Sequence, residues 1–283
     1  NTEMTVDLGQ TDDQTPDDTL TALNFNNVVG SSGNDSLIGN DNDNRLVGSG
    51  GDDTVLGITG NNTLVGGEGI NLLFGGDGDD LIIAGTQDNV SGGDGTDTLL
   101  IDGDDDVVIA MPNDIEVLMT REGDDSLVGT PGSDSIISAG GNNTLDGGGG
   151  GDFFAGGSGG DVIIATSDPD IFAFNEPSDG PDTLLDQGLL SGLLDFDNNA
   201  VLVSAAGFGG GLTPGALPSG KFTLDSSASD PDHRFILHQP LPLLGDDVLY
   251  YDPDGNGPDP QVPILVFRDM TLLDFGDTSI VVF

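Results

Sequence analysis

The chain has 283 residues, of which 50 are Asp or Glu and only 5 are Lys or Arg, so that its formal net charge at pH 7 is -45. A polyanion of this strength repels nucleic acids and anionic membranes, and its natural partners are cations. Cysteine is absent, which excludes disulfide bonds and thiolate chemistry.

The N-terminal segment, NTEMTVDLGQTDDQTPDD, has neither the basic region nor the apolar core of a secretory signal. We therefore expect either a leader that has been removed or export by another route. No segment approaches the roughly 20 apolar residues that a membrane-spanning helix requires, so no membrane insertion is expected.

From Gly30 onwards the chain divides into nine-residue repeats, such as GGDGDDLII at Gly75 to Ile83. Gly dominates positions 1 and 4, position 6 is Asp or Asn, and position 8 is almost always aliphatic or Phe. Positive backbone torsions are cheap only for Gly, so the first six residues predict a tight turn and the last three a very short strand. About fifteen repeats run to residue 174, and the irregular segment Ala110 to Thr120 interrupts them.

One strand and one turn carry the chain only halfway round, so a full coil needs two repeats, and turns on one edge lie 18 residues apart. The position-6 side chains of each edge then stack. In the first block the stacks are Asp35, Asp53, Asn71, Asp88 and Asp106 on one edge, and Asn44, Asn62, Asp80 and Asp97 on the other. In the second block they are Asp125, Asn143 and Asp161, and Asp134, Asp152 and Asp170.

Carboxylates stacked at the sheet spacing of about 4.8 Å repel one another unless a cation lies between them. Ca²⁺ accepts roughly six to eight oxygens in irregular geometry, including the carbonyls that a Gly-rich turn exposes, whereas Mg²⁺ demands a small octahedron. About five to ten Ca²⁺ ions are therefore expected. The predicted ligands are Asp35, Asp53, Asn71, Asp80, Asp88, Asp97, Asp106, Asp125, Asp134, Asn143, Asp152, Asp161 and Asp170.

The repeats resemble the GGxGxDxUx nonapeptides of the RTX, or hemolysin-type calcium-binding, family; GGDGDDLII, GGDGTDTLL and GGSGGDVII are the most similar copies. The resemblance covers roughly residues 30 to 174 and implies a right-handed parallel β-roll with Ca²⁺ between successive turns on each edge. Asn44, Asn62, Asn71 and Asn143 depart from the family's Asp, and each loses a charge but keeps an oxygen ligand. We expect graded affinities, with the weakest sites at about 10⁻⁴ to 10⁻³ M, and the gap between Asn44 and Asn62 is a candidate for an empty site.

The last part of the chain has a different composition, since only two of the 13 Phe precede Phe153 and only three of the 15 Pro precede Pro169. This predicts a compact β-rich domain from about Ile171. Stretches such as SDPDHRFIL and VLYYDPDGNG resemble the region that follows many RTX repeats, which implies a cap on the roll and an uncleaved signal for type I secretion. A solenoid needs such a cap, because its last coil exposes an unpaired edge.

The predicted fold class is all-β: a right-handed parallel β-roll, which is a calcium-binding solenoid, followed by a compact β-rich C-terminal cap domain. The expected parts are an N-terminal segment at 1–29, a first block of the roll at 30–109, an irregular interruption at 110–120, a second block at 121–174 and the cap at 175–283.

Two patterns outside the repeats have both a functional and a structural interpretation. Asp252 to Gly257 matches the first half of an EF-hand loop, but Pro263 occupies the position of the required bidentate Glu. This favours a hairpin turn over a separate Ca²⁺ site. His233 and His238 have no Cys or HExxH spacing nearby, so surface or packing roles are favoured over zinc binding.

The pentapeptide GGSGG at Gly156 to Gly160 fits the nucleophile-elbow pattern, but it is in register with the repeats and precedes a predicted strand. Catalysis by Ser158 is therefore not expected, and we predict that the chain is not an enzyme.

Position 9 is also apolar, although only position 8 should point inward. Two interpretations stay open: apolar stripes that mark an interface, or side chains that neighbouring strands shelter. The segment Ala110 to Thr120 is a candidate cover for one stripe. The residues concerned are Ile38, Leu56 and Phe74 on one face, and Val47, Val65 and Ile83 on the other.

These features predict a secreted, extracellular calcium-binding structural protein of a surface layer, matrix fibre or adhesin, which forms a homo-oligomer or polymer when Ca²⁺ fills the stacks. The alternative is the C-terminal export and folding module of a larger type I-secreted enzyme, such as a protease, lipase or epimerase. A carbohydrate- or ice-binding face would need flat rows of Thr, and the row at position 7 is interrupted by Arg45, Leu72 and Leu81.

Overall fold

The computed structural model describes residues 5–7, 18–21, 26–165, 168, 170–174, 182–186, 200–203, 215–216, 222–224, 235–238, 247–251, 262–268 and 280–282. Every regular element in these ranges is a β-strand, so the all-β prediction is confirmed there. None of the described residues belongs to a helix long and apolar enough to cross a membrane.

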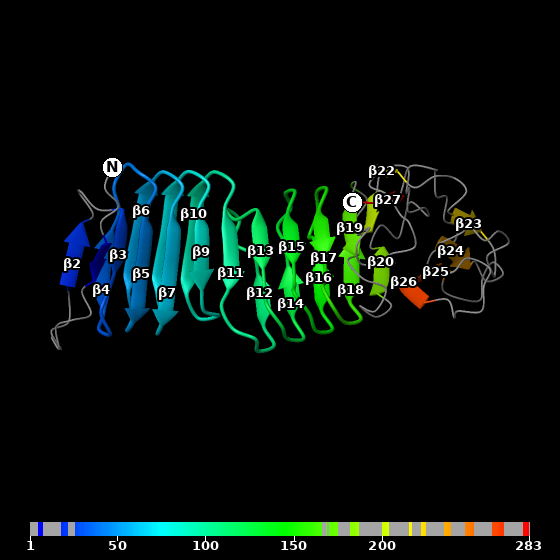
Figure 1. The fold of residues 1–283 in the computed structure, drawn as a ribbon, viewed down its shortest axis with the longest axis horizontal. Helices are drawn as coiled ribbons and strands as arrows, with labels where there is room; N and C mark the ends of the chain where they lie inside the picture. Colours follow the sequence, from blue (N-terminus) through cyan, green and yellow to red (C-terminus); the bar gives the residue numbers. More distant parts are fainter. Residues whose placement is uncertain are drawn as a thin grey trace. The chain divides into compact units, whose positions relative to one another are not determined.

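The chain forms two compact units, of which the first comprises Asn1–Asp104 and Met111–Arg121. It contains two parallel sheets, with the odd-numbered strands in one and the even-numbered strands in the other (Figure 1). The first sheet has the order β1 (Thr5–Asp7), β3 (Asn27–Val29), β5 (Arg45–Gly50), β7 (Thr63–Glu68), β9 (Leu81–Ala84), β11 (Thr98–Ile101) and β13 (Val117–Met119). The second has the order β10 (Asn89–Asp94), β8 (Leu72–Asp77), β6 (Thr54–Thr59), β4 (Asp35–Ile38) and β2 (Asp18–Thr21).

The second unit comprises Asp105–Ala110 and Glu122–Phe283 and also has two sheets, in which only the first strands alternate in this way. One sheet has the order β15 (Ser135–Ile137), β17 (Phe153–Ala155), β19 (Ile171–Phe174), β21 (Ala200–Val203), β27 (Ile280–Val282) and β22 (Gly215–Ala216). The other has the order β12 (Val108–Ala110), β14 (Ser126–Val128), β16 (Thr144–Asp146), β18 (Val162–Ala165), β20 (Asp182–Asp186), β26 (Val262–Arg268), β25 (Asp247–Tyr251), β24 (Phe235–His238) and β23 (Phe222–Leu224).

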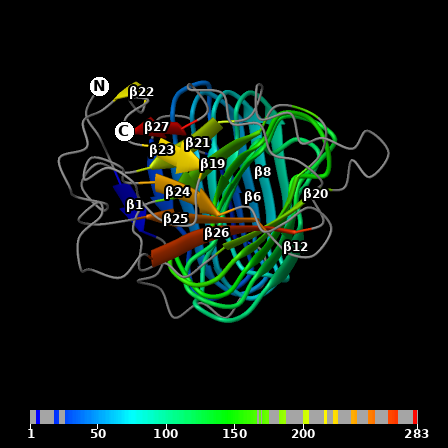
Figure 2. The ribbon, with the colours of Figure 1, turned by 90° about the vertical axis from the view of Figure 1, so that its right-hand side faces the viewer.

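The parallel β-roll predicted from the repeats is confirmed, because consecutive strands alternate between two sheets and each coil takes two repeats. Arg45 of β5 pairs with Thr63 of β7, which is the predicted spacing of 18 residues. Where the repeats slip, the pairing follows, since Leu81 of β9 pairs with Thr98 of β11 at a spacing of 17. Seen end-on, the strands of successive coils lie behind one another (Figure 2).

Position 8 supplies the core of each unit, as the sequence predicts. In the first unit Leu37, Leu46, Val55, Leu64, Leu73 and Ile82 have no exposed surface, and in the second Leu127, Ile136, Leu145 and Phe154 have none. Neighbouring coils also stack aromatic rings, because the centroids of Phe154 and Phe172 lie 5.7 Å apart with nearly parallel planes. Because each coil of a solenoid contacts only its neighbours, burial of these side chains between coils supplies the apolar stabilisation of the roll.

Position 9 is half-buried at Ile38, Leu56, Val47, Val65 and Ile83. Neighbouring strands therefore shelter most of these side chains, as one of the two interpretations predicts. Phe74 is the exception, with 41% of its surface exposed.

Several other predictions concern the last part of the chain. In that part β24 pairs with β25 and β25 with β26 in antiparallel fashion. The loop Asp252 to Gly257 and His233 lie outside the described residues, as does most of the predicted cap. The GGSGG segment forms a turn after β17, and Ser158 bridges Gly140 of the preceding coil in parallel, so this segment is a repeat turn.

Candidate calcium sites

The position-6 side chains bind successive coils together through one of their two polar atoms. The backbone N–H of Asp35 donates to Asp53 Oδ1 at 2.8 Å, and that of Asp53 donates to Asn71 Oδ1 at 2.9 Å. Asn71 continues the series by donating to Asp88 Oδ1 at 2.8 Å. We call Asp35, Asp53, Asn71 and Asp88 the Asp35 row.

The other edge of the first unit carries the Asn44 row, which begins with Asn44, Asn62, Asp80 and Asp97. Its backbone N–H groups donate to the next Oδ1 at 3.0, 2.6 and 2.8 Å in turn. In the second unit the same contact, at 2.8 to 3.0 Å, joins Asp125 to Asn143 and Asn143 to Asp161, and joins Asp134 to Asp152 and Asp152 to Asp170. The predicted neighbours within each stack are thus adjacent, apart from Asp106.

The second carboxylate oxygen points toward the Gly at position 1 of its own repeat. A Cβ atom built on Gly48 would lie 2.2 Å from Asp53 Oδ2 and 2.6 Å from the carbonyl oxygen of Gly66. At Gly75 the corresponding atoms are Asp80 Oδ2 at 2.2 Å and the Gly92 oxygen at 2.5 Å. Each of these glycines therefore leaves a space into which a carboxylate oxygen and a carbonyl oxygen of the next coil converge.

Four of these carboxylate oxygens have no protein donor. The Oδ2 atoms of Asp53, Asp80, Asp97 and Asp125 are buried and accept no hydrogen bond within the part of the chain that the structure describes. A buried acceptor without a donor is costly, and a buried charge without a counter-charge is costlier. A cation between the two converging oxygens would satisfy both.

Several carboxyl groups of the rows have raised pKa values, as expected for buried acids without a counter-charge. Burial, with a smaller contribution from neighbouring carboxylates, raises the pKa of Asp53 and of Asp97 to about 6 and that of Asp152 to about 7. Burial also raises the pKa of Asp80. These carboxyls therefore hold protons more tightly than ordinary Asp side chains when no cation is bound.

Other turns have protein donors for the second oxygen. Asp35 Oδ2 accepts from the Ser31 N–H at 2.5 Å, and Asp134 Oδ2 accepts from the Thr130 N–H at 2.6 Å. Asp88 Oδ2 accepts from the Gly85 N–H at 2.9 Å. Of these seven predicted ligands, four thus lack a donor for the second oxygen among the described residues and three have one.

In two of the Asn turns the amide itself reaches the turn carbonyls. Asn62 Nδ2 donates to the carbonyl oxygens of Gly60 at 2.9 Å and Thr59 at 3.4 Å. Asn143 Nδ2 donates to the carbonyl oxygen of Gly156 at 3.1 Å. At Asn143 an N–H donor thereby satisfies the next-coil carbonyl that a cation would otherwise contact, and at Asn62 it satisfies two carbonyls of its own turn.

A family model described as the RTX calcium-binding nonapeptide repeat (4 copies) matches residues 22–55, 56–90 and 119–154. These segments are RTX calcium-binding repeats. The matched segments contain members of the Asp35 row, the Asn44 row and both series of the second unit. The resemblance inferred from the nonapeptides is therefore confirmed. RTX repeats bind Ca²⁺, and the described part of this chain contains rows of buried Asp side chains.

Two further comparisons complete this result. The extracellular lipase LipA from Serratia marcescens is 17% identical to this chain with a TM-score of 0.20, and the match covers 93% of this chain and 42% of the lipase chain. The chain therefore spans less than half of the length of that lipase. A search of curated proteins found no match.

The RTX turns can coordinate a cation only if backbone carbonyl oxygens are among its ligands. Within the described residues, no group of three or more His, Cys, Asp or Glu side chains is arranged to hold a metal ion. The convergence at Gly48 and Gly75 instead offers one carboxylate oxygen with one carbonyl oxygen of the next coil. Ca²⁺ accepts such mixed oxygen ligands and fills its remaining positions with water.

Asp106 does not occupy the position that the nine-residue spacing predicts. Val107 does so instead: it is buried, and its N–H donates to Asp125 Oδ1 at 3.1 Å. Asp106 is exposed, and its Oδ1 accepts from the Asp124 N–H at 2.8 Å. The repeat is shifted by one residue, because Ile109 rather than Val108 pairs with the position-8 residue Leu127.

Asp106 belongs to an exposed series at position 5 that the sequence analysis missed. Here the side chain of one coil accepts from the backbone of the next coil, which is the reverse of the buried rows. Asp52 N–H donates to Asn34 Oδ1 at 2.8 Å, and Asn61 N–H donates to Asp43 Oδ1 at 2.8 Å. The signal was present as the Asp or Asn that often precedes position 6.

The sequence analysis also missed two acidic residues that extend the buried rows. Asp97 N–H donates to Glu116 Oε2 at 2.8 Å, and Asp161 N–H donates to Asp182 Oδ1 at 2.8 Å. The only signal was an acidic residue two positions before an aliphatic one. Those aliphatic residues, Leu118 and Leu184, have no exposed surface.

Proposed function

We propose that this chain is a secreted calcium-binding structural protein of the cell surface or extracellular matrix, which folds and assembles when Ca²⁺ fills its buried rows. The observation that supports the proposal is the set of buried Asp oxygens without donors. These are the Oδ2 atoms of Asp53, Asp80, Asp97 and Asp125.

The coupling between calcium and folding follows from the cost of these oxygens. Without a cation, folding places carboxylates such as Asp53 and Asp80 in buried positions, where water no longer solvates them. In the unfolded chain the same groups are hydrated and far apart. Ca²⁺ that binds only the folded roll stabilises it in proportion to the logarithm of its concentration.

The coupling also fits export. In a compartment with little free Ca²⁺ the chain would stay unfolded, and it would fold where Ca²⁺ reaches millimolar levels. Ten ions would neutralise roughly 20 of the 45 net negative charges, so the folded roll would remain acidic and soluble.

The buried rows assign different roles to the predicted ligands. We infer that the carboxylates without donors, such as Asp53 and Asp80, contribute most to Ca²⁺ binding. Asp35, Asp88 and Asp134 would bind more weakly, because protein donors already engage the second oxygen. The Asn62 turn would need no ion, because its amide already contacts the carbonyls.

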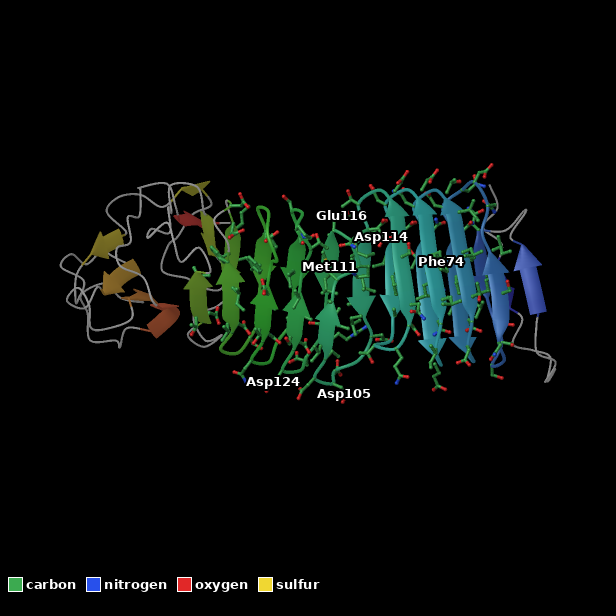
Figure 3. All side chains as sticks on the ribbon, turned by 180° about the vertical axis from the view of Figure 1, so that it is seen from behind. Phe74, Asp105, Met111, Asp114, Glu116 and Asp124 are labelled. Atoms are coloured by element: carbon green, nitrogen blue, oxygen red, sulfur yellow. The ribbon has the colours of Figure 1, made fainter. Side chains whose placement is uncertain are left out.

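A specific surface feature supports assembly. Leu72 and Phe74 of β8 are both exposed, at 39% and 41% of their surface, and Ile58 of β6 is exposed at 43%. Figure 3 labels Phe74 on this part of the first unit. Exposed apolar side chains on neighbouring strands favour contact with another surface.

Sedimentation velocity of the purified chain tests the proposal. In excess chelator we expect a slow, expanded species, and in millimolar Ca²⁺ a compact form that associates into larger species. A matched variant, Phe74→Ser, should retain the compact form and associate less. A compact monomer at every protein concentration would favour the alternative role as an export and folding module, and the same compact species in chelator would overturn calcium-coupled folding.

A further inference from the structure

The segment between the two RTX blocks builds a coil of the roll although it lacks the nonapeptide pattern. Met111, Ile115 and Leu118 are buried, and β13 pairs in parallel with β11. The Val117 N–H donates to the Asp97 carbonyl oxygen at 3.0 Å. The Thr63 N–H makes the equivalent contact with the Asn44 carbonyl at 2.8 Å within the repeats.

Glu116 takes the place of a position-6 Asp in this coil. It immediately precedes β13, as Asp97 immediately precedes β11, and its Oε2 accepts from the Asp97 N–H at 2.8 Å. Asp97 and Glu116 are 19 residues apart. Glu116 therefore extends the Asn44 row by one carboxylate.

A backbone oxygen of the same segment completes the arrangement. A Cβ atom built on Gly92 would lie 2.2 Å from the Asp114 carbonyl oxygen and 2.4 Å from Asp97 Oδ2. This is the convergence found at Gly75, except that Asp114 replaces a repeat glycine as the source of the carbonyl. The Asp114 carboxylate is engaged elsewhere, because its Oδ2 accepts from Ser91 Oγ at 2.5 Å.

Asp97 supplies the observation that points to a ligand. Its side chain has no exposed surface, and its Oδ2 has no hydrogen-bond donor among the described residues although it faces the Asp114 carbonyl oxygen. Asp97 Oδ2 and the Asp114 carbonyl oxygen therefore converge, and the Glu116 carboxylate lies beside them, within hydrogen-bond distance of the Asp97 N–H.

We propose that Asp97 Oδ2, the Asp114 carbonyl oxygen and the Glu116 carboxylate form a calcium site that closes the Asn44 row. Asp114 and Glu116 lie at the same edge of the first unit (Figure 3). The site rests on the proposed function, since it assumes that Ca²⁺ fills the rows, and it adds ligands from outside the RTX repeats. With two carboxylates it should bind more tightly than the turn formed by Asn44 and its neighbour Asn62, which has none.

Equilibrium dialysis against Ca²⁺ tests this site in the full chain, with Glu116→Gln as the variant. The amide oxygen of Gln can still accept from the Asp97 N–H, so the variant removes the charge and keeps the hydrogen bond. We expect it to bind about one calcium ion fewer than the unaltered chain at a concentration that just saturates the latter. Glu68→Gln is the matched control, because Glu68 is exposed and stands in none of the rows, and it should bind as the unaltered chain does.

The outcomes separate this proposal from the previous one. If the unaltered chain binds calcium and Glu116→Gln binds the same number with the same affinity, the site is overturned while the proposed function stands. If the unaltered chain binds none, both are overturned. Should the variant fail to fold, a crystal structure of the unaltered chain in calcium decides: density between Asp97 Oδ2 and the Asp114 oxygen supports the site, and its absence there with ions elsewhere in the row overturns it.

Discussion

Asn62 donates from its Nδ2 to the carbonyl oxygen of Gly60 at 2.9 Å, whereas Asp80, its neighbour in the Asn44 row, presents a buried Oδ2 that has no donor in the described part of the chain. The two side chains have the same shape and hold the same position in their repeats. One satisfies its turn with its own N–H group, and the other requires a cation or a proton. Exchanging the two residue types should therefore exchange the calcium requirement of the two turns.

Asn62→Asp should make folding more dependent on calcium. The substitution replaces a satisfied amide with a buried carboxylate, which should destabilise the metal-free roll by about 2 kcal/mol. It should also create an additional calcium site, so the calcium-induced folding transition followed by circular dichroism should become steeper. Asn61→Asp, at the exposed neighbouring position, is the control and should leave the steepness unchanged.

Asp80→Asn should have the opposite effect. The amide oxygen can keep the hydrogen bond from the Asn62 N–H, and the buried charge disappears. Fewer ions are then taken up on folding, so the transition should become shallower. Asp79→Asn, at an exposed position whose Oδ1 accepts from the Thr96 N–H, should leave it unchanged. Equal steepness in Asp80→Asn and the unaltered chain would argue against an ion at this turn.

Ile58→Gly should stabilise the roll. Ile58 has a φ of 88°, a left-handed conformation that is unfavourable for a β-branched residue, and Gly67 and Gly76 adopt such values at the same position of later repeats. Relief of this strain should contribute about 1 kcal/mol, so folding should begin at a lower calcium concentration. Ile70→Gly removes a similarly exposed side chain from a residue that has no positive φ. If Ile70→Gly stabilised the chain as much as Ile58→Gly, the strain argument would be contradicted.

Acid should partly replace calcium in the metal-free chain. The pKa values of Asp53 and Asp97 are about 6 and that of Asp152 is about 7 when folded, against an ordinary value of 3.8. Between roughly pH 4 and 7 the folded state thus binds more protons than the unfolded state, and its stability falls as the pH rises through this window. Strand signal in chelator should therefore increase from pH 8 to pH 5.5, and a decrease would contradict these pKa shifts.

The regular part of the fold could be predicted because each repeat carries its own signal. Position 8 predicts the buried Leu46 and Leu73, and position 6 predicts the rows, since the spacing between coils is nearly constant. Asp106 was misplaced because two valines follow three successive aspartates in this repeat, and pattern alone cannot decide which Val faces inward.

The ends of the rows could not be predicted in this way. Glu116 follows Asp97 by 19 residues and Asp182 follows Asp161 by 21, so neither keeps the nine-residue register. Their places depend on how the intervening segments pack, as the buried Met111 and Ile115 illustrate. The hydrogen bonds of Asn62 Nδ2 likewise depend on the positions of carbonyls in the folded turn.

Circular dichroism of the unaltered chain during a calcium titration tests the central claim most directly. The buried rows predict little strand signal in excess chelator and a cooperative gain as Ca²⁺ rises into the range of about 10⁻⁴ to 10⁻³ M. Mg²⁺ at the same concentrations should not reproduce the gain. A full strand signal in chelator, unchanged by Ca²⁺, would contradict the account, because the carboxylates of the rows would then be buried without needing an ion.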